Sequence, residues 1–511
     1  MKVRAAPDNP ISLPHRMTSL RFRVVLLLAW LASVGWLVRY EAFPGWFNQV
    51  SSGYRQIFAG GEFVSDTWMQ ILYEGRPIGY SHTWVDRAPE DRAEAYVVRN
   101  LTHVQMKIME RVQKINMQTT VVLDADCRLQ RFAFLMPSGT YSVGIEGRRV
   151  KGKSFKVNLK TPSGAREEHV DIPDDAVLYS PMTEIAVAGL RPGQQMRVRT
   201  LEPITLTASD VLFEGVRRES YVFEGTTQEV SVIKVTFQGM DMLTWVDAGG
   251  RALRQETSLG WVMEARSQER IEMMRLGAGS DMIQSLAVPC AGTIAAPRSA
   301  QSLRVRMTLS TSTWDRVETP RQAIEQETGG GREYVLLLRA QQPPGSNAVA
   351  GADLAPYLRA SSFIQSDHPS MIKQAKAIAA GATGAWAQAR AIGKWVHENV
   401  RKQPAASLPS ALDVLTFRSG DCNEHTYLFV GLARAAGIPA RIHVGLAYNE
   451  GMFYYHAWPA VHVGEWVEMD PTFGQDCADA THITLLTGEL ASQMQLGRLL
   501  GRLKITVLEE R

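Results

Sequence analysis

Three residue types that together carry out thiol-based acyl transfer occur in order near the C-terminal end of the chain. They are Cys422, His456 and Asp470. A thiolate attacks a carbonyl carbon, an imidazole carries the proton, and a carboxylate fixes the tautomer and orientation of the imidazole. A lone cysteine is usually a buried small hydrophobic residue, and a lone histidine on a strand is usually structural. The chemistry therefore depends on whether the fold brings the three together.

Cys422 is expected in the first turn of a helix. Asp421 is a good N-cap residue, and Glu424 follows it at the spacing of a capping box. We expect the helix to end at Gly437, with Pro439 just beyond it. Because free N–H groups and the positive end of the helix dipole lie at this end, the position favours a thiolate and could also receive an oxyanion.

The histidine and the aspartate are expected on neighbouring antiparallel strands. The predicted strands are residues 441–448, 453–461 and 465–470. A three-residue loop at 462–464 places His456 directly opposite Asp470, at a side-chain separation of roughly 5 Å. A two-residue loop would shift the register by one and separate the pair.

Two aromatic residues share the strand face of His456, namely Trp458 and Tyr454. Each is a candidate for binding the acyl group of a substrate, and Trp458 also for binding the oxyanion. Simple packing on the sheet face explains either residue equally well. Glu468, predicted opposite Trp458, either supports the site or is solvated.

The chain order of the three residues distinguishes among thiol enzymes. Papain-like proteases carry the histidine far beyond the cysteine and caspases carry it before, whereas His456 follows Cys422 by 34 residues. The surrounding segments resemble the transglutaminase-like superfamily. The segments that carry this resemblance are residues 408–415, 420–425, 435–441, 455–458, 467–472 and 479–483.

The resemblance covers residues 361–508 and implies a papain-like or transglutaminase-like α+β domain. It implies that Cys422 is the nucleophile, His456 the base and acid, and Asp470 the orienting carboxylate. The superfamily includes crosslinking enzymes, peptidases, amidases and members without activity, so it indicates the machinery better than the reaction. We expect no cofactor and no metal. A zinc site built from Cys422, His425, Cys477 and His482 is disfavoured, because the spacing matches no compact zinc motif.

The N-terminal part predicts export. Residues 1–23 carry five Lys or Arg and one acid, and an uncharged apolar stretch follows. We expect a cytoplasmic basic tail over 1–23, an uncleaved transmembrane anchor over 24–40 and a juxtamembrane linker over 41–64. A cleaved signal peptide is the alternative, because Ser33-Val34-Gly35 is an acceptable cleavage site. With an anchor, the chain is a single-pass protein of the bacterial inner membrane, with its N-terminus inside and its bulk in the periplasm.

The remaining organisation is α+β. Strand patterns dominate residues 65–340, which predicts a large antiparallel β-rich domain, in the form of a sandwich or an incomplete barrel. Residues 341–360 are a predicted linker and 361–508 the catalytic domain, with helices expected over 369–380 and 383–400. The β-rich part shows no catalytic constellation.

Composition excludes some functions. A net charge of +3 on 511 residues, without a basic motif, argues against nucleic acid as a partner. Because an exported chain permits disulfides, Cys127, Cys290 and Cys477 could supply one bridge.

Three functions follow as expectations. The first is an exported thiol enzyme for amide or peptide carbonyls, with hydrolysis slightly favoured over crosslinking transfer to an amine. Its partner would be a protein or peptide, such as one of the cell envelope. The alternative is a catalytically silent module for peptide binding or envelope assembly. Thirdly, the β-rich region could bind an envelope polymer or a partner protein that the catalytic domain modifies.

Overall fold

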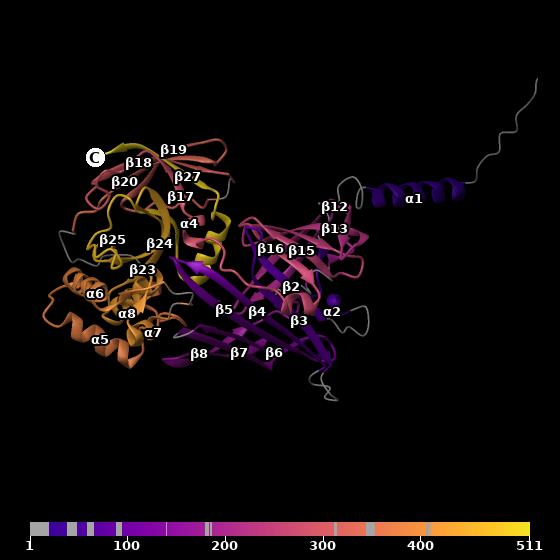
Figure 1. Cartoon of the computed structure of the whole chain (residues 1–511), viewed down its shortest axis with the longest axis horizontal. Coiled ribbons are helices and arrows are strands. Elements are labelled where there is room, and N and C mark those ends of the chain that lie inside the picture. The colour runs from indigo at the N-terminus through magenta and orange to yellow at the C-terminus, as the bar shows by residue number, and fades with distance from the viewer. Residues whose placement is uncertain are drawn as a thin grey trace, which may run out of the picture.

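The fold is known from a computed structural model. It describes residues 20–37, 49–58, 66–87, 95–138, 141–178, 183, 187–310, 314–343, 353–404, 408 and 410–511. These residues form two large sheets, and a group of helices packs on the second sheet (Figure 1).

The first sheet has 16 strands and consists of two antiparallel meanders joined edge to edge. One meander runs from β2 to β9 and the other from β11 to β16, and β16 pairs antiparallel with β2. The strands of this sheet are β1 (Gln49–Val50), β2 (Asp66–Tyr73), β3 (Arg76–Arg87), β4 (Tyr96–Ile108), β5 (Arg111–Leu123), β6 (Leu129–Ser138), β7 (Tyr141–Lys151), β8 (Ser154–Thr161), β9 (Gly164–Asp171), β10 (Val177–Leu178), β11 (Gln195–Glu202), β12 (Thr207–Phe223), β13 (Thr226–Phe237), β14 (Met240–Val246), β15 (Ala252–Thr257) and β16 (Trp261–Arg266). The predicted large antiparallel β-rich region is confirmed.

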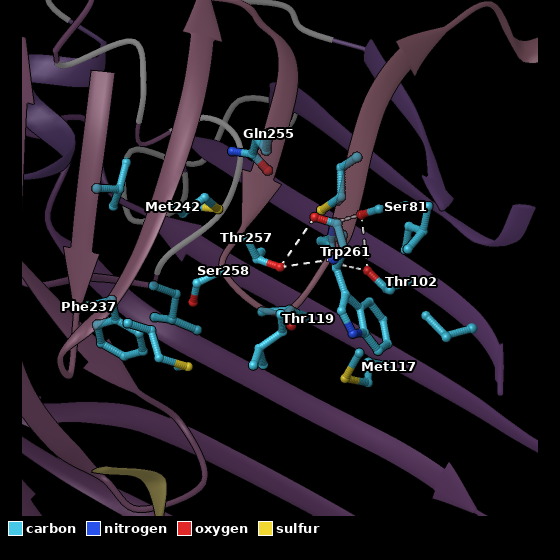
Figure 2. Close-up of a pocket in the computed structure, with 18 of the residues that line it drawn as sticks. Ser81, Thr102, Met117, Thr119, Phe237, Met242, Gln255, Thr257, Ser258 and Trp261 are labelled. Atoms are coloured by element: carbon cyan, nitrogen blue, oxygen red, sulfur yellow. Dashed lines mark hydrogen bonds between the residues drawn. The ribbon is translucent and has the colours of Figure 1, made fainter. Parts of the chain in front are cut away.

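This sheet is strongly curved. β5 and β13 lie seven strand-to-strand steps apart in the sheet order, so a flat sheet would separate them by roughly 34 Å. Met117 of β5 and Phe237 of β13 nevertheless line the same cavity (Figure 2). The two meanders therefore bend towards each other and enclose a space between them.

The second sheet has nine strands, in the order β19-β20-β18-β27-β17-β24-β23-β26, with β25 on β24. They are β17 (Val288–Ala291), β18 (Ser302–Leu309), β19 (Gln322–Thr328), β20 (Glu333–Arg339), β23 (Ala440–Asn449), β24 (Met452–His462), β25 (Trp466–Glu468), β26 (Ile483–Thr487) and β27 (Leu503–Glu510). The predicted domain boundary at residue 340 divides the strands of this sheet. β17 pairs with β24 and β27, β18 pairs with β27 and β20, and β20 pairs with β19. These four strands support the C-terminal domain.

Four helices cover the part of the second sheet that is expected to hold the site: α5 (Pro369–Ala379), α6 (Ala385–Asn399), α7 (Ala411–Phe417) and α8 (Cys422–Ala435). The helices predicted over 369–380 and 383–400 are confirmed as α5 and α6. Short elements complete the described chain: α2 (Tyr54–Ile57), α3 (Gln268–Glu272), α4 (Met282–Ser285), α9 (Leu490–Gln493), the 3-10 turns Ala355–Leu358 and Met494–Arg498, and the strand pair β21 (Arg401–Lys402) and β22 (Ser419–Gly420).

The helix α1 (Leu20–Leu37) lies where the anchor is predicted. Among the residues that the structure describes, none of the helices reaches the combination of length and apolar character that crossing a membrane requires. Most of the basic tail and of the linker lies outside the described residues. The membrane anchor therefore stays a prediction from the sequence.

The first sheet contacts α7 and β22, the elements that precede Cys422, through polar groups. The Tyr141 hydroxyl of β7 donates to the Ser419 carbonyl. The buried carboxylate of Asp413, in α7, accepts from the Ser163 amide at 2.8 Å. One hydrophobic core cluster also runs from the first sheet into α5, α6 and α8. The nucleophile segment is thus held from the side of the β-rich region.

Candidate active site

Cys422 is the first residue of α8, as predicted, and the capping box is present. The Asp421 carboxylate accepts the Asn423 amide at 2.9 Å, and the Glu424 carboxylate accepts the Asp421 amide at 2.9 Å. Gly420 has a φ of +157°, and a Cβ there would lie 2.2 Å from the Cβ of Glu424. The way this helix begins therefore accounts for Gly420, Asp421 and Glu424.

The cap limits which groups can bind an oxyanion. The side chain of Asp421 takes up the amides of Asn423 and Glu424. These two helix-start N–H groups cannot also receive an oxyanion, contrary to the expectation that this turn offers several free donors. The amide of Cys422 itself is the remaining donor of the turn.

The first turn of α8 is fixed on β24 beside His456. The Thr426 hydroxyl donates to the Ala457 carbonyl at 3.0 Å, and Cys422 lies one helical turn earlier, on the same face of α8. The backbone of Ala457 also hydrogen-bonds the Cys422 thiol. Since Ala457 directly follows His456, the thiol faces the part of β24 that carries the histidine.

His456 and Asp470 meet as predicted. The Nε2 of His456 lies 2.7 Å from the Oδ2 of Asp470. The predicted hairpin register is wrong by two residues, because His462 pairs with Trp466 and the turn is residues 463–465. A shift of two keeps every side chain on its original face of the sheet. For that reason the pair survives, with Asp470 just beyond the end of β25.

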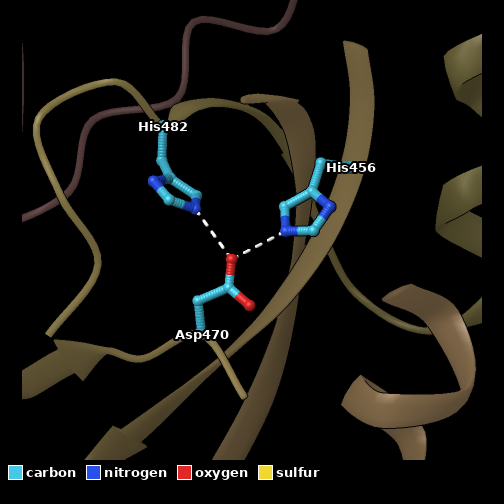
Figure 3. Close-up of side chains that lie close together, drawn as sticks. All are labelled: His456, Asp470 and His482. Atoms are coloured by element: carbon cyan, nitrogen blue, oxygen red, sulfur yellow. Dashed lines mark hydrogen bonds and ion pairs between the residues drawn. The ribbon is translucent and has the colours of Figure 1, made fainter. Parts of the chain in front are cut away.

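Asp470 is a fully buried acceptor of four hydrogen bonds. Its Oδ1 accepts the amides of Thr472 at 2.7 Å and Phe473 at 2.9 Å. Its Oδ2 accepts from His456 and also from the Nε2 of His482 at 3.0 Å (Figure 3). Burial alone would raise the pKa of Asp470, but the two histidines hold that pKa well below its usual range. The carboxylate is therefore ionised.

The contact between His482 and Asp470 was missed by sequence reasoning, which considered His482 only as a disfavoured zinc ligand. Its ring is fully buried, and its Nδ1 lies 3.1 Å from the Oδ1 of Asp479. The Oδ2 of Asp479 accepts from Arg298 at 2.7 Å. Burial lowers the pKa of His482, but hydrogen bonds to Asp470 and Asp479 outweigh it and raise that pKa above its usual value. The available sequence signal was its place in segment 479–483, which supported the family resemblance but did not place it beside Asp470.

The ring of His456 is held between aromatic groups. It stacks on Phe473, with ring centroids 4.9 Å apart, and its other stacked neighbour is Trp458, at 5.9 Å. The guanidinium of Arg298 lies over the Phe473 ring, 4.1 Å from its centroid. Together with the bond to Asp470, these contacts fix the plane of the imidazole.

The two aromatic candidates differ in the structure. Trp458 is fully buried, and its Nε1 donates to the Oε2 of Glu468 at 2.7 Å. That carboxylate also pairs with the buried Nε of Arg321 at 2.7 Å. The indole N–H of Trp458 is therefore not available to an oxyanion, and Glu468 is not solvated. Tyr454 is half-buried on β24.

The Cys422 thiol differs from expectation in its acidity. Burial and the neighbouring carboxylate of Asp421 raise the pKa of Cys422 well above the ordinary thiol value, and the charges of Glu424 and Asp470 add to this. Burial is the largest of these causes, and it favours the neutral thiol. The resting group is a thiol that needs a base, and the predicted resting thiolate is wrong.

Three buried side chains of the described residues could hold a metal ion. His456, Asp470 and His482 each offer one ligand atom, and these atoms lie within 4.8 Å of one another. Two imidazoles and a carboxylate suit Zn²⁺ or Fe²⁺, but a metal there would occupy the Nε2 of His456. His425, a member of the zinc set considered above, is buried with its ring nitrogens on the carbonyls of Asp421 and Val400.

All four cysteines are described and free, so the disulfide is not formed.

Comparison with known proteins addresses the C-terminal domain. Residues 372–471 match the model of the transglutaminase-like superfamily. No curated protein matches the chain. A proposed cysteine protease from Cytophaga hutchinsonii is similar in structure, with 17% identity, 42% of this chain and 89% of that chain covered, and a TM-score of 0.30. The periplasmic domain of TgpA from Pseudomonas aeruginosa, bound to ethylmercury, is also similar, with 17% identity and a TM-score of 0.27. The match covers 35% of this chain and 76% of that chain. The matched residues include Cys422, His456 and Asp470, and the C-terminal part of this chain contains a domain of the transglutaminase-like superfamily.

Proposed function

We propose that the C-terminal domain is a thiol enzyme that acts on amide or peptide carbonyls through a thioester of Cys422. The observation that carries this proposal is the 2.7 Å bond between His456 and Asp470, on the strand to which the first turn of α8 is hydrogen-bonded. The nucleophile, the base and the orienting carboxylate then follow one another in space in the order that thiol acyl transfer needs.

The protonation states follow from the contacts. The ionised Asp470 accepts the Nε2–H of His456, so the lone pair lies on Nδ1. Nδ1 takes the thiol proton as the Cys422 sulfur attacks the carbonyl carbon. Because the thiol pKa is raised, this base is required for attack, and the backbone amide of Cys422 donates to the developing oxyanion.

The remaining steps reuse the same imidazole. His456 gives its proton to the departing amine, the C–N bond breaks, and an acyl thioester of Cys422 remains. In hydrolysis, His456 takes a proton from water, the hydroxide oxygen attacks the thioester, and the carboxylic acid leaves as the thiol is restored. An amine in place of water gives a new amide. We propose hydrolysis, since water is always present.

A catalytically silent module for peptide binding or envelope assembly is the second candidate. The observation that favours it is the raised pKa of the Cys422 thiol, which makes spontaneous reactivity low. The paired His456 and Asp470 favour the enzyme, because binding alone gives no reason for a base beside a thiol.

We propose in addition that the domain works outside the cytoplasm on a protein or peptide of the cell envelope. The support is the basic segment 1–23 ahead of an uncharged apolar stretch in the sequence. Under this proposal α1 belongs to an inner-membrane anchor, and the β-rich region binds the partner that the domain modifies.

The test is turnover of a panel of peptide p-nitroanilides and peptide amides by the full chain, with and without hydroxylamine as a competing nucleophile. We expect product release that is lost in Cys422→Ala, and hydroxamate formation that reports the thioester. Equal release by wild type and Cys422→Ala would falsify the thiol mechanism. Saturable peptide binding without any product would support the silent module.

A further inference from the structure

The curved first sheet encloses a cavity that is separate from the site around Cys422. Its volume is about 510 Å³, within the roughly 300–1,000 Å³ range of small-molecule pockets. Its walls come from β2 to β5 on one side and from β13 to β16 on the other. Tyr54, Leu178 and the β15–β16 turn residues Ser258 and Leu259 complete the lining. Figure 2 shows Met117, Thr119 and Trp261 among the side chains that face this space.

The lining is apolar and adaptable. Four of its residues are methionines, contributed by three different strands: Met117 from β5, Met240 and Met242 from β14, and Met263 from β16. Methionine is unbranched and polarisable, so such walls adjust to a flexible hydrocarbon. Val98, Val121 and Val235, each almost fully buried, form the more rigid remainder.

Several polar groups in the wall already have hydrogen-bond or ion-pair partners in the protein. Ser81 and Thr102 are hydrogen-bonded at 3.0 Å, and the Asn100 amide donates to Ser81 at 2.9 Å. Asp241 is the single charged lining residue among those described. Its carboxylate pairs with Lys234 at 3.3 Å and accepts the Thr236 hydroxyl at 2.8 Å.

The positions of buried polar atoms that lack a partner also indicate an apolar site. In the described part of the chain, the buried polar side-chain atoms that have no partner belong to residues outside this cavity. The wall therefore offers little to a ligand that is recognised by hydrogen bonds or charge. It suits a ligand recognised by its hydrocarbon surface.

An apolar cavity of this size is costly when empty. Its lining atoms lose contacts that a filled interior would provide, and apolar cavities hold water poorly. We propose that this cavity binds one hydrocarbon chain of the fatty-acyl class. Free fatty acids and single-chain lipids share this chemistry, and the chain is what the wall recognises.

The experiment uses the full chain and a fluorescent polyene fatty acid, whose emission rises in apolar surroundings. Met117→Trp and Met263→Trp place an indole inside the cavity. Thr119→Leu is a milder variant in case an indole prevents folding. Val222→Trp, on an exposed position of β12 (65% exposed), is the matched control. Palmitate, a neutral lysophospholipid and an aromatic dye compete for the probe in separate titrations.

We expect saturable binding of about one probe per chain, with the Kd raised at least about tenfold by an indole in the cavity, less by Thr119→Leu, and unchanged in Val222→Trp. Competition by palmitate alone assigns the site to free acids, and competition by both chain molecules assigns it to single-chain lipids as well. Absence of saturable binding, equal Kd values in cavity and control variants, or displacement by the aromatic dye alone would each overturn the proposal.

Discussion

The Nε2 of His482 lies 3.0 Å from the Oδ2 of Asp470, the oxygen that also accepts from His456 at 2.7 Å. One carboxylate oxygen therefore orients two imidazoles. His456 is followed on β24 by Ala457, whose backbone hydrogen-bonds the Cys422 thiol, whereas His482 is tied at its other nitrogen to Asp479. Under the proposed mechanism, His456 is therefore the base, and His482 is a positioning residue that holds Asp470 in place.

Replacing the shared carboxylate should lower the rate strongly but leave some turnover, because the nucleophile and the base both remain. In Asp470→Asn, the amide cannot stabilise the imidazolium of His456, and the wrong tautomer is favoured. We expect kcat to fall by about 10³–10⁴-fold with some turnover left. Single-turnover kinetics on a peptide substrate, with far-UV circular dichroism as a check of folding, measure this. A loss smaller than about tenfold would contradict the role given to Asp470.

His482 should make stability depend on pH in a defined direction. Its pKa is raised in the folded state, so its contribution is fully present below the unfolded pKa of about 6.5 and is lost as pH rises through the folded pKa. Urea unfolding of wild type and His482→Gln at a series of pH values should therefore give curves that differ most at acidic pH.

His443 is the matched control for that titration, because burial lowers its pKa to about 4. Its contribution is present above about 6.5 and is lost as pH falls through the folded pKa. The curve for His443→Gln should thus differ from wild type most at neutral and alkaline pH. If the stability of both variants depended on pH in the same way, His482 would not be a protonated imidazolium bound by Asp470 and Asp479.

The buried pair of Arg321 and Glu468 should be strongly coupled. Both side chains are fully buried, 2.7 Å apart, and Glu468 also holds Trp458. Arg321→Met leaves an unpaired buried carboxylate, so we expect a loss of about 3–5 kcal/mol in the free energy of unfolding. The double variant Arg321→Met/Glu468→Gln should recover part of this loss in chemical denaturation. Additive effects of the two changes would argue against direct coupling.

The acidity of Cys422 can be measured directly. Because burial and Asp421 raise its pKa, the midpoint of its alkylation by iodoacetamide should lie above the ordinary thiol value of about 8.5. Peptide mapping separates Cys422 from the other three cysteines. Asp421→Asn should move the midpoint down. A wild-type midpoint well below the ordinary value would mean a resting thiolate and would contradict the base-dependent mechanism.

Local sequence signals predicted the helix start at Cys422 and the pairing of His456 with Asp470. The capping box at Asp421 fixed the helix start and hence the place of Cys422, because capping depends on residues a few positions apart. The predicted pairing of His456 with Asp470 is confirmed although the predicted register was wrong by two residues. Strand periodicity decides on which face of the sheet a side chain lies, but it does not decide the exact partner.

Contacts between residues far apart in the chain, and burial, could not be predicted from the sequence. Arg298 and Arg321 come from the region next to β17 to β20, far from the site in sequence, and their contacts depend on which strands pair in the second sheet. The contact of His482 with Asp470 could not be predicted for the same reason, because it forms only after the chain turns back. The raised pKa of Cys422 depends on burial, which no spacing of residues reveals.

The most direct measurement is pre-steady-state acylation of the full chain by an activated ester, followed by p-nitrophenolate release and intact mass. The mechanism predicts a burst of one acyl group per chain, mapped to Cys422, absent in Cys422→Ala and at least about 10²-fold slower in His456→Ala. A burst that persists in His456→Ala at the wild-type rate, or an acyl group on Cys127, Cys290 or Cys477 instead, would contradict it.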